Sequence, residues 1–271
     1  MRKIGGVCHP PDKPDGSPSI RFFFWCYNRY MLEKISEHVY RRKQEPDTDR
    51  PHLYLIVNGN RSIAIDAGNS AAHVHSFYKD MDDKLPLPSM TIITHAHWDH
   101  TYGLHAISGT SLSSQKTADK LKQMASWEWS EEAMEERLNS GEEIAFCAEC
   151  MKLEYPDLSQ IKVVPPVETF TGEHDVDLNG LAIHLKEVAN PHEVDGTLVI
   201  VDDLVILGDA SSPDYYHLDG LYDESRLEAF IQLLKEYPEY RFCHSHIDEI
   251  MTLEEYLDAL KDEADKTGYI K

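Results

Sequence analysis

Hydrophobic and polar residues alternate in several short stretches of this chain, which is the pattern of β-strands with one buried face. Residues 53–57 and 61–66 flank the strong turn signal Asn58-Gly59-Asn60 and predict a hairpin. Residues 197–201 and 204–207 predict a second tight hairpin. Further strands are expected, in chain order, at 21–27, 90–94, 107–112, 181–188 and 240–243.

Apolar residues spaced about one helical turn apart predict helices between and after these strands. Residues 71–83, 227–237 and 253–266 have this spacing. Residues 115–155 are charged with scattered Met, Trp and Leu, and a break near Ser140-Gly141 predicts two helices there. Hairpins in both halves, with helices between and after them, favour an α/β fold of two mixed sheets with helices outside.

Size and charge narrow the classes of function. The 271 residues fit one large α/β domain or two small ones. Twenty-six basic against 48 acidic residues give a net charge of -22, which argues against nucleic acid as a partner. The basic cluster Arg41-Arg42-Lys43 is short and is expected to be a solvated loop.

The lack of a recognisable targeting signal and the arrangement of the cysteines predict a cytoplasmic protein. The chain has no apolar run near the roughly 18 to 20 residues of a membrane span, and its start has no apolar region typical of a secretory signal. Five cysteines without a regular framework favour a reduced setting. Cys147 and Cys150 are expected to be free thiols in a helical segment, with a metal or redox role as the alternative.

The segment with the clearest chemistry follows the apolar run 90–93. His95, His97, Asp99 and His100 form a His-x-His-x-Asp-His sequence. Imidazole and carboxylate are the ligands that zinc and similar cations prefer. The loop is too short to be a helical H-E-x-x-H site, and its order directly after a buried-type strand argues against a chance cluster.

Other polar residues follow other predicted strands, at the positions where catalytic groups tend to lie. His192 follows the strand 181–188, and Asp209 follows the second hairpin. His244 and His246 follow the last strand. These residues are candidates to complete a metal site with the His-x-His-x-Asp-His loop.

With these segments in this order, the chain resembles the metallo-β-lactamase-fold hydrolase superfamily over about residues 53–246. The resemblance implies a four-layered αββα sandwich with two metal ions at one edge. It implies a single domain over 1–271, with a helical insert at about 115–166. Met124, Trp127 and Trp129 in this insert are candidates for a pocket wall.

The resemblance also implies the role of each ligand. His95, His97 and His192 hold the first metal, Asp209 bridges both metals, and Asp66 braces the metal loop by hydrogen bonds. Asp99, His100 and the late histidine hold the second metal. His246 is preferred as that histidine because Ser245 resembles the small residue that precedes it in the family, and His244 is the alternative. The remaining candidates are interpreted as non-ligands: His73, His75 and His105 are expected on a helix or loop surface. The mid-strand His184 is expected to pack in the core or on the surface.

Two divalent cations about 3.5 to 4 Å apart lower the pKa of a shared water from about 15.7 toward about 7. The predicted function is therefore a dinuclear-metal hydrolase that uses a metal-bound hydroxide on an acyl, lactone or related ester-type bond. Zinc is the expected metal, with manganese or iron as alternatives. Asp99 is also assigned a catalytic role, orienting the water and shuttling a proton. Tyr215, or its neighbour Tyr216, is the candidate to contact the substrate carbonyl, as a tyrosine does in lactone-cleaving relatives.

Other functions stay open. An iron-dependent, persulfide dioxygenase-like oxidoreductase uses the same fold, and a phosphodiesterase is a further alternative. A non-catalytic metal sensor would not need the full ligand set. The expected partner is a small-molecule substrate, without membrane association, and a homo-oligomer remains an open alternative.

Overall fold

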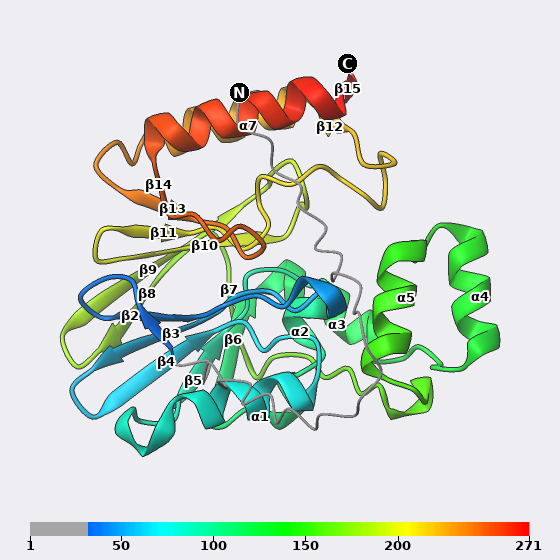
Figure 1. Ribbon diagram of the computed structural model, residues 1–271, viewed down its shortest axis with the longest axis horizontal. Helices are drawn as coiled ribbons and strands as arrows, with labels where there is room; N and C mark the ends of the chain where they lie inside the picture. Colours follow the sequence, from blue (N-terminus) through cyan, green and yellow to red (C-terminus); the bar gives the residue numbers. More distant parts are fainter. Residues whose placement is uncertain (1–31, 271) are drawn as a thin grey trace, which may run out of the picture.

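The computed structural model describes residues 32–270. Two mixed β-sheets face each other, and helices cover their outer faces, as Figure 1 shows with α7 on one side and α1 on the other. This is the four-layered αββα arrangement of the α/β class that was predicted. The strand expected at 21–27 lies outside the described residues, as do Cys8 and Cys26.

The first sheet has the strand order β1-β2-β3-β4-β5-β6-β7. Its strands are β1 (Glu33–Lys34), β2 (Val39–Arg42), β3 (Leu53–Asn58), β4 (Arg61–Ile65), β5 (Met90–Ile92), β6 (Thr110–Ser114) and β7 (Glu168–Phe170). The pairs from β1 to β4 are antiparallel, and those from β4 to β7 are parallel.

The second sheet has the strand order β14-β13-β11-β10-β9-β8. Its strands are β8 (Glu173–Leu178), β9 (Leu181–Val188), β10 (Gly196–Val201), β11 (Leu204–Ile206), β13 (Arg241–Cys243) and β14 (Met251–Thr252). A separate pair joins β12 (Tyr222–Asp223) to β15 (Tyr269–Ile270). Both predicted hairpins are present, as β3-β4 and β10-β11.

The helices are α1 (Ala71–Asp80), α2 (Trp98–Thr101), α3 (Gln115–Met124), α4 (Glu131–Ser140), α5 (Ala145–Glu154), α6 (Glu224–Leu234) and α7 (Leu253–Thr267). Residues 115–155 therefore form three helices instead of the predicted two. The break at Gly141 was expected, and this residue has a left-handed φ of 78°. The other break was missed: the Ser130 hydroxyl accepts a hydrogen bond from the Ala133 N–H and begins α4.

Successive side chains of a strand point to opposite faces of its sheet, and this alternation explains how the layers pack. Tyr54 and Ile56 of β3 face the core between the two sheets. Leu53 and Leu55, on the opposite face of the same strand, pack against Phe77 of α1. On the far side, α6 and α7 bury apolar residues such as Phe230 against the second sheet. The two sheets therefore form the inner layers of the sandwich, and the helices form its outer layers.

The basic cluster is only in part the solvated loop that was expected: Lys43 is exposed and follows β2, whereas the two arginines are buried. Arg41 and Arg42 lie in β2 and are each only 3% exposed. The Arg42 guanidinium pairs with Asp80 at 2.9 Å and also with Glu45. Arg41 donates to the Asp248 carbonyl at 2.8 Å. Asp80 and Asp248 lie far along the chain from these arginines, so the local sequence does not show them as partners.

Strand direction brings the predicted site together at one edge. In the first sheet β4 and β5 are parallel, so Asp66 and the loop after β5 emerge side by side. In the second sheet β11 and β13 are parallel, and β9 runs the same way because β10 is antiparallel to both β9 and β11. His192, Asp209 and His246 follow these strands. Among residues 32–270, no helix is long and apolar enough to cross a membrane.

Candidate metal centre

The loop after β5 is held in place by Asp66. This carboxylate accepts hydrogen bonds from the Thr94 N–H at 2.8 Å and from the His100 Nδ1–H at 2.8 Å. Asp66 itself has a left-handed φ of 63°, directly after β4. One side chain thus fixes both the start of the loop and the short helix α2 that carries Asp99 and His100.

Three histidines form a first group at this edge. The ligand atoms of His95, His97 and His192 all lie within 4.8 Å of one another. The Nδ1 of His97 is 2.9 Å from the Nε2 of His192. His192 donates its Nδ1–H to the Pro213 carbonyl at 2.9 Å, which leaves its Nε2 facing the other two rings.

A second group of four residues adjoins the first. The ligand atoms of Asp99, His100, Asp209 and His246 also lie within 4.8 Å of one another. The Nε2 of His246 is 3.1 Å from Asp99 Oδ2 and 3.3 Å from Asp209 Oδ2. The ring centroids of His95 and His100 are 4.2 Å apart, so the two groups are in contact.

Gly208 allows Asp209 to reach this position. It has a left-handed φ of 59°, and a Cβ at this residue would lie only 2.7 Å from the Thr94 hydroxyl oxygen. Any side chain would therefore strain the backbone and push against the metal loop. This close approach brings the end of β11, in the second sheet, against the loop of the first sheet.

The structure distinguishes the two late histidines. His246 belongs to the second group, whereas the Nε2 of His244 lies 3.1 Å from the Ser212 hydroxyl. The His244 Nδ1 accepts the backbone N–H of His246 at 3.1 Å. His244 therefore lies behind His246 and supports its backbone.

Burial and charge set the protonation of these groups. Burial, together with the charge of His97, lowers the pKa of His192 to about 4. Burial also opposes protonation of His246, but the carboxylates of Asp209 and Asp99 outweigh it and raise its pKa to about 10. Burial would raise the pKa of Asp99, yet His100 and His246 hold it well below its usual range. In the second group, imidazolium protons thus supply the positive charge that a divalent cation would replace.

The donor set fits a divalent metal site. The His95 Nε2 and the Asp209 Oδ1 are buried at the centre and have no hydrogen-bond partner among residues 32–270. Such atoms are costly to bury unless something binds them. Imidazole nitrogens and carboxylate oxygens in this ratio suit zinc and its first-row neighbours.

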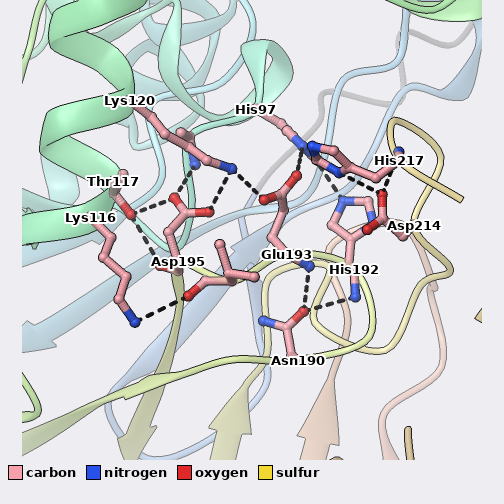
Figure 2. A network of polar contacts seen from close by, with 12 residues as sticks. His97, Lys116, Thr117, Lys120, Asn190, His192, Glu193, Asp195, Asp214 and His217 are labelled. Carbon is pink, nitrogen blue, oxygen red and sulfur yellow. Dashed lines mark hydrogen bonds and ion pairs between the residues drawn. The ribbon is translucent and has the colours of Figure 1, made fainter. Parts of the chain in front are cut away.

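Glu193, Lys120 and Asp195 are site residues that sequence reasoning missed. Figure 2 shows them between α3 and the first histidine group. Glu193 accepts a hydrogen bond from the His97 Nε2–H at 2.8 Å, and Asp195 accepts one from the Ala96 N–H at 3.1 Å. The only signal in the sequence was that both carboxylates closely follow His192.

Asp49 was also missed, and no pattern in the sequence pointed to it. It lies at the end of the 3₁₀ turn Pro46–Thr48, with its Oδ1 4.0 Å from the Nδ1 of His246. Burial and the neighbouring Asp99 raise the pKa of Asp49 to about 7. Asp49 thus lies near the Nδ1 of His246, whereas Asp99 lies near the Nε2 of the same ring.

Both groups open onto a cleft of about 500 Å³. Tyr215 lines it with 48% of its surface exposed, and its ring lies 6.2 Å from that of His192. No residue among 32–270 hydrogen-bonds its hydroxyl, and burial raises its pKa. Tyr216 also lines the cleft, but its hydroxyl donates to Glu143 at 3.0 Å. Tyr215 is therefore the tyrosine with a free hydroxyl.

A smaller cavity of about 220 Å³ shares His97 and Tyr216 with the cleft. Met124 and Trp127 line it, as the sequence suggested. Trp129 instead packs against Tyr102, with ring centroids 5.4 Å apart. Helix α5 contributes Cys147 to the main cleft, and Cys147 and Cys150 are free thiols as predicted.

The other histidines considered from the sequence, namely His73, His75, His105 and His184, lie outside both groups. His73 was expected on a helix or loop surface, but it lies on the buried face of α1 and is not exposed at all. It packs close to Gly68, where a side chain would collide with the imidazole, and this tertiary contact is not visible in the helical pattern. His75 is exposed, His105 is half-buried, and the half-buried His184 pairs with Asp175 in the strand pair β8-β9.

Several solved structures resemble this one at low sequence identity. A metallo-β-lactamase from Pontibacter korlensis is 16% identical with a TM-score of 0.59, covering 88% of this chain and 99% of its own. A metallo-β-lactamase from Hirschia baltica is 14% identical with a TM-score of 0.57, covering 89% and 98%. The sec-alkylsulfatase Pisa1 from Pseudomonas sp. is 14% identical with a TM-score of 0.57, covering 87% of this chain and 41% of its own. No protein-family model matches the sequence, and no curated protein matches it.

Proposed function

We propose that this chain, which has the metallo-β-lactamase fold, is a dinuclear-metal hydrolase that cleaves an acyl, lactone or related ester-type bond. The likeness to the solved structures confirms the fold that the sequence predicted. The single observation that supports the proposed activity is the pair of adjoining ligand groups, with buried unpartnered atoms of His95 and Asp209, open to a substrate-sized cleft.

In this proposal the ligand roles follow the two groups. His95, His97 and His192 would hold one ion, Asp99, His100 and His246 would hold the other, and Asp209 would bridge them. Zinc is the first choice, with manganese or iron as alternatives. When bound, such ions polarise a carbonyl oxygen and lower the pKa of a coordinated water.

Two side chains would then act on the substrate and the water. Asp99 can use one carboxylate oxygen as a ligand and the other to orient the attacking water and accept its proton. Tyr215 faces the same cleft with a free hydroxyl, and its raised pKa keeps it protonated at neutral pH. It can therefore donate a hydrogen bond to the oxygen on which charge develops.

The cleft favours an uncharged substrate. Among the described residues that line it, none is lysine or arginine, whereas Ile144 and Phe146 provide apolar wall. An anionic phosphodiester or sulfate would find positive charge only at the metal centre. The names of the structural neighbours denote enzymes acting on β-lactams and on alkyl sulfates, so the fold by itself leaves the substrate open.

We further propose a small-molecule substrate and a reduced, cytoplasmic setting. The free thiols of Cys147, Cys150 and Cys243 support such a setting. The net charge of -22 argues against a nucleic acid substrate. A homo-oligomer remains an expectation.

The test combines metal analysis with a substrate panel. Purified protein should hold two zinc or manganese ions per chain and hydrolyse members of a panel of esters, lactones, thioesters, β-lactams and phosphodiesters. His97→Ala and Asp209→Ala should abolish turnover while the thermal unfolding transition persists, and the exposed His75→Ala should change neither. Unchanged activity in both ligand variants would refute the proposal. A single iron with oxygen uptake would instead support the oxidoreductase alternative.

A further inference from the structure

A chain of polar contacts connects the half-buried Lys120 of helix α3 to the first histidine group (Figure 2). Lys120 of α3 pairs with Glu193, and its Nζ also lies 3.3 Å from Asp195 Oδ1. Glu193 in turn accepts the hydrogen bond from the Nε2–H of His97 at 2.8 Å. The chain therefore runs from Lys120 through Glu193 to His97.

Glu193 is held rigidly in this position. The residue is 3% exposed, and its backbone N–H donates to the Asn190 Oδ1 at 2.8 Å. The same oxygen accepts the backbone N–H of His192 at 3.0 Å. One asparagine thus fixes the backbone of both the histidine and the glutamate that follows it.

This geometry determines which nitrogen His97 presents to the first group. Because Nε2 carries the proton that Glu193 accepts, the Nδ1 lone pair is directed toward His192, 2.9 Å away. A carboxylate on the distal nitrogen also makes an imidazole a better metal ligand. Lys120 compensates the buried negative charge of Glu193, which would otherwise be costly.

We propose that Glu193 is a positioning residue that fixes the tautomer and orientation of His97, and that Lys120 holds Glu193 in place for this role. The inference rests on the proposed function, in which His97 binds the first metal. It gives α3, in the predicted helical insert, an influence on that metal that passes through Glu193 and His97. In the second group, His100 is braced by Asp66 instead, and neither Lys120 nor Glu193 hydrogen-bonds or ion-pairs with a described member of that group.

The structure offers a matched control one turn earlier in α3. Lys116 pairs with Glu187 at 2.7 Å, and within residues 32–270 neither side chain hydrogen-bonds or ion-pairs with a member of the two groups. Lys116→Met removes the same kind of lysine from the same helix. Any effect of losing surface charge on α3 should therefore appear in both variants, whereas an effect through Glu193 should appear only in Lys120→Met.

The experiment measures metal affinity directly. The experiment compares the full-length wild type with four variants: Glu193→Gln, Lys120→Met, Lys120→Arg and Lys116→Met. Each protein is titrated with Zn²⁺ against a chromophoric chelator, and with Co²⁺ followed by visible absorption. Glu193→Gln should lower the affinity for one of the two ions by about 10- to 100-fold and change one set of cobalt absorption bands, while the affinity for the other ion stays unchanged. Lys120→Met should lower the affinity for the same ion by a smaller factor. Lys120→Arg should retain most of that affinity, and Lys116→Met should bind both ions as wild type does.

Two results would overturn the inference without touching the proposed function. One is wild-type affinity for both ions in Glu193→Gln. The other is an equal loss of affinity for both ions in Glu193→Gln, together with a lower unfolding temperature of this variant without metal. Such a result would indicate a general structural role. If wild type itself binds no divalent cation, the proposed function fails and this inference fails with it.

Discussion

The Nδ1 of His100 lies 2.8 Å from the Oδ2 of Asp66, and neither side chain is exposed to solvent. Asp66 directly follows β4, whereas His100 lies in α2 beyond the next strand. Asp66 also accepts the N–H of Thr94. A single carboxylate therefore connects two neighbouring strand ends and fixes the loop on which most of the candidate ligands lie.

Asp66→Ala should destabilise the metal-free protein strongly. It leaves the Thr94 N–H and the His100 Nδ1–H buried without an acceptor, and each unsatisfied donor costs about 1 to 3 kcal/mol. Asp66→Asn keeps one carbonyl oxygen as an acceptor and should therefore lose less free energy of unfolding. Urea unfolding at pH 7.5 measures the difference, with the exposed Asp175→Asn as a control. If Asp66→Ala is as stable as wild type, the bracing role is wrong.

The two late histidines should differ in metal content. The Nε2 of His246 faces Asp99 and Asp209, whereas that of His244 faces the Ser212 hydroxyl. His246→Ala should therefore lose one of two bound ions, and His244→Gln should keep both. Elemental analysis of protein equilibrated with zinc measures this directly. Two ions in His246→Ala and one in His244→Gln would reverse the assignment.

His73 should make the protein sensitive to mild acid. Burial, with the charges of Arg42 and Arg50, lowers its pKa well below 6.5. The folded state thus binds fewer protons than the unfolded state below pH 6.5. The contribution of this residue is complete above that pH and is lost as the pH falls, at up to about 1.4 kcal/mol per pH unit.

His73→Leu should therefore flatten the fall in the free energy of unfolding between pH 6.5 and 5.5. Both ring nitrogens lack a hydrogen-bond partner among the described residues, so the substitution leaves no group unpaired there. Urea unfolding of the metal-free protein at these two pH values gives the slope. The exposed His75→Leu on the same helix should keep the wild-type slope, and an equal slope in His73→Leu would contradict this account.

Features that depend on neighbouring residues in the chain could be predicted from the sequence. The alternation around Asn58-Gly59 determines a hairpin because side-chain direction and turn geometry are local. The order of polar residues after successive strands predicted which segments meet at one edge, since parallel strand ends lie side by side there. The structure brings His97, His192 and Asp209, which were predicted in this way, into the two groups.

Features that depend on residues far apart in the chain were decided only by the tertiary structure. Arg41 and Arg42 are buried with partners far along the chain, the Asp248 carbonyl and Asp80 respectively, and the sequence alone showed only a basic cluster. The contact of Glu193 with His97 joins the loops of two different sheets. The choice between His244 and His246 likewise depended on which ring the fold turned toward Asp99. Local pattern determines how each segment folds, whereas burial and charge pairing arise only when the segments pack together.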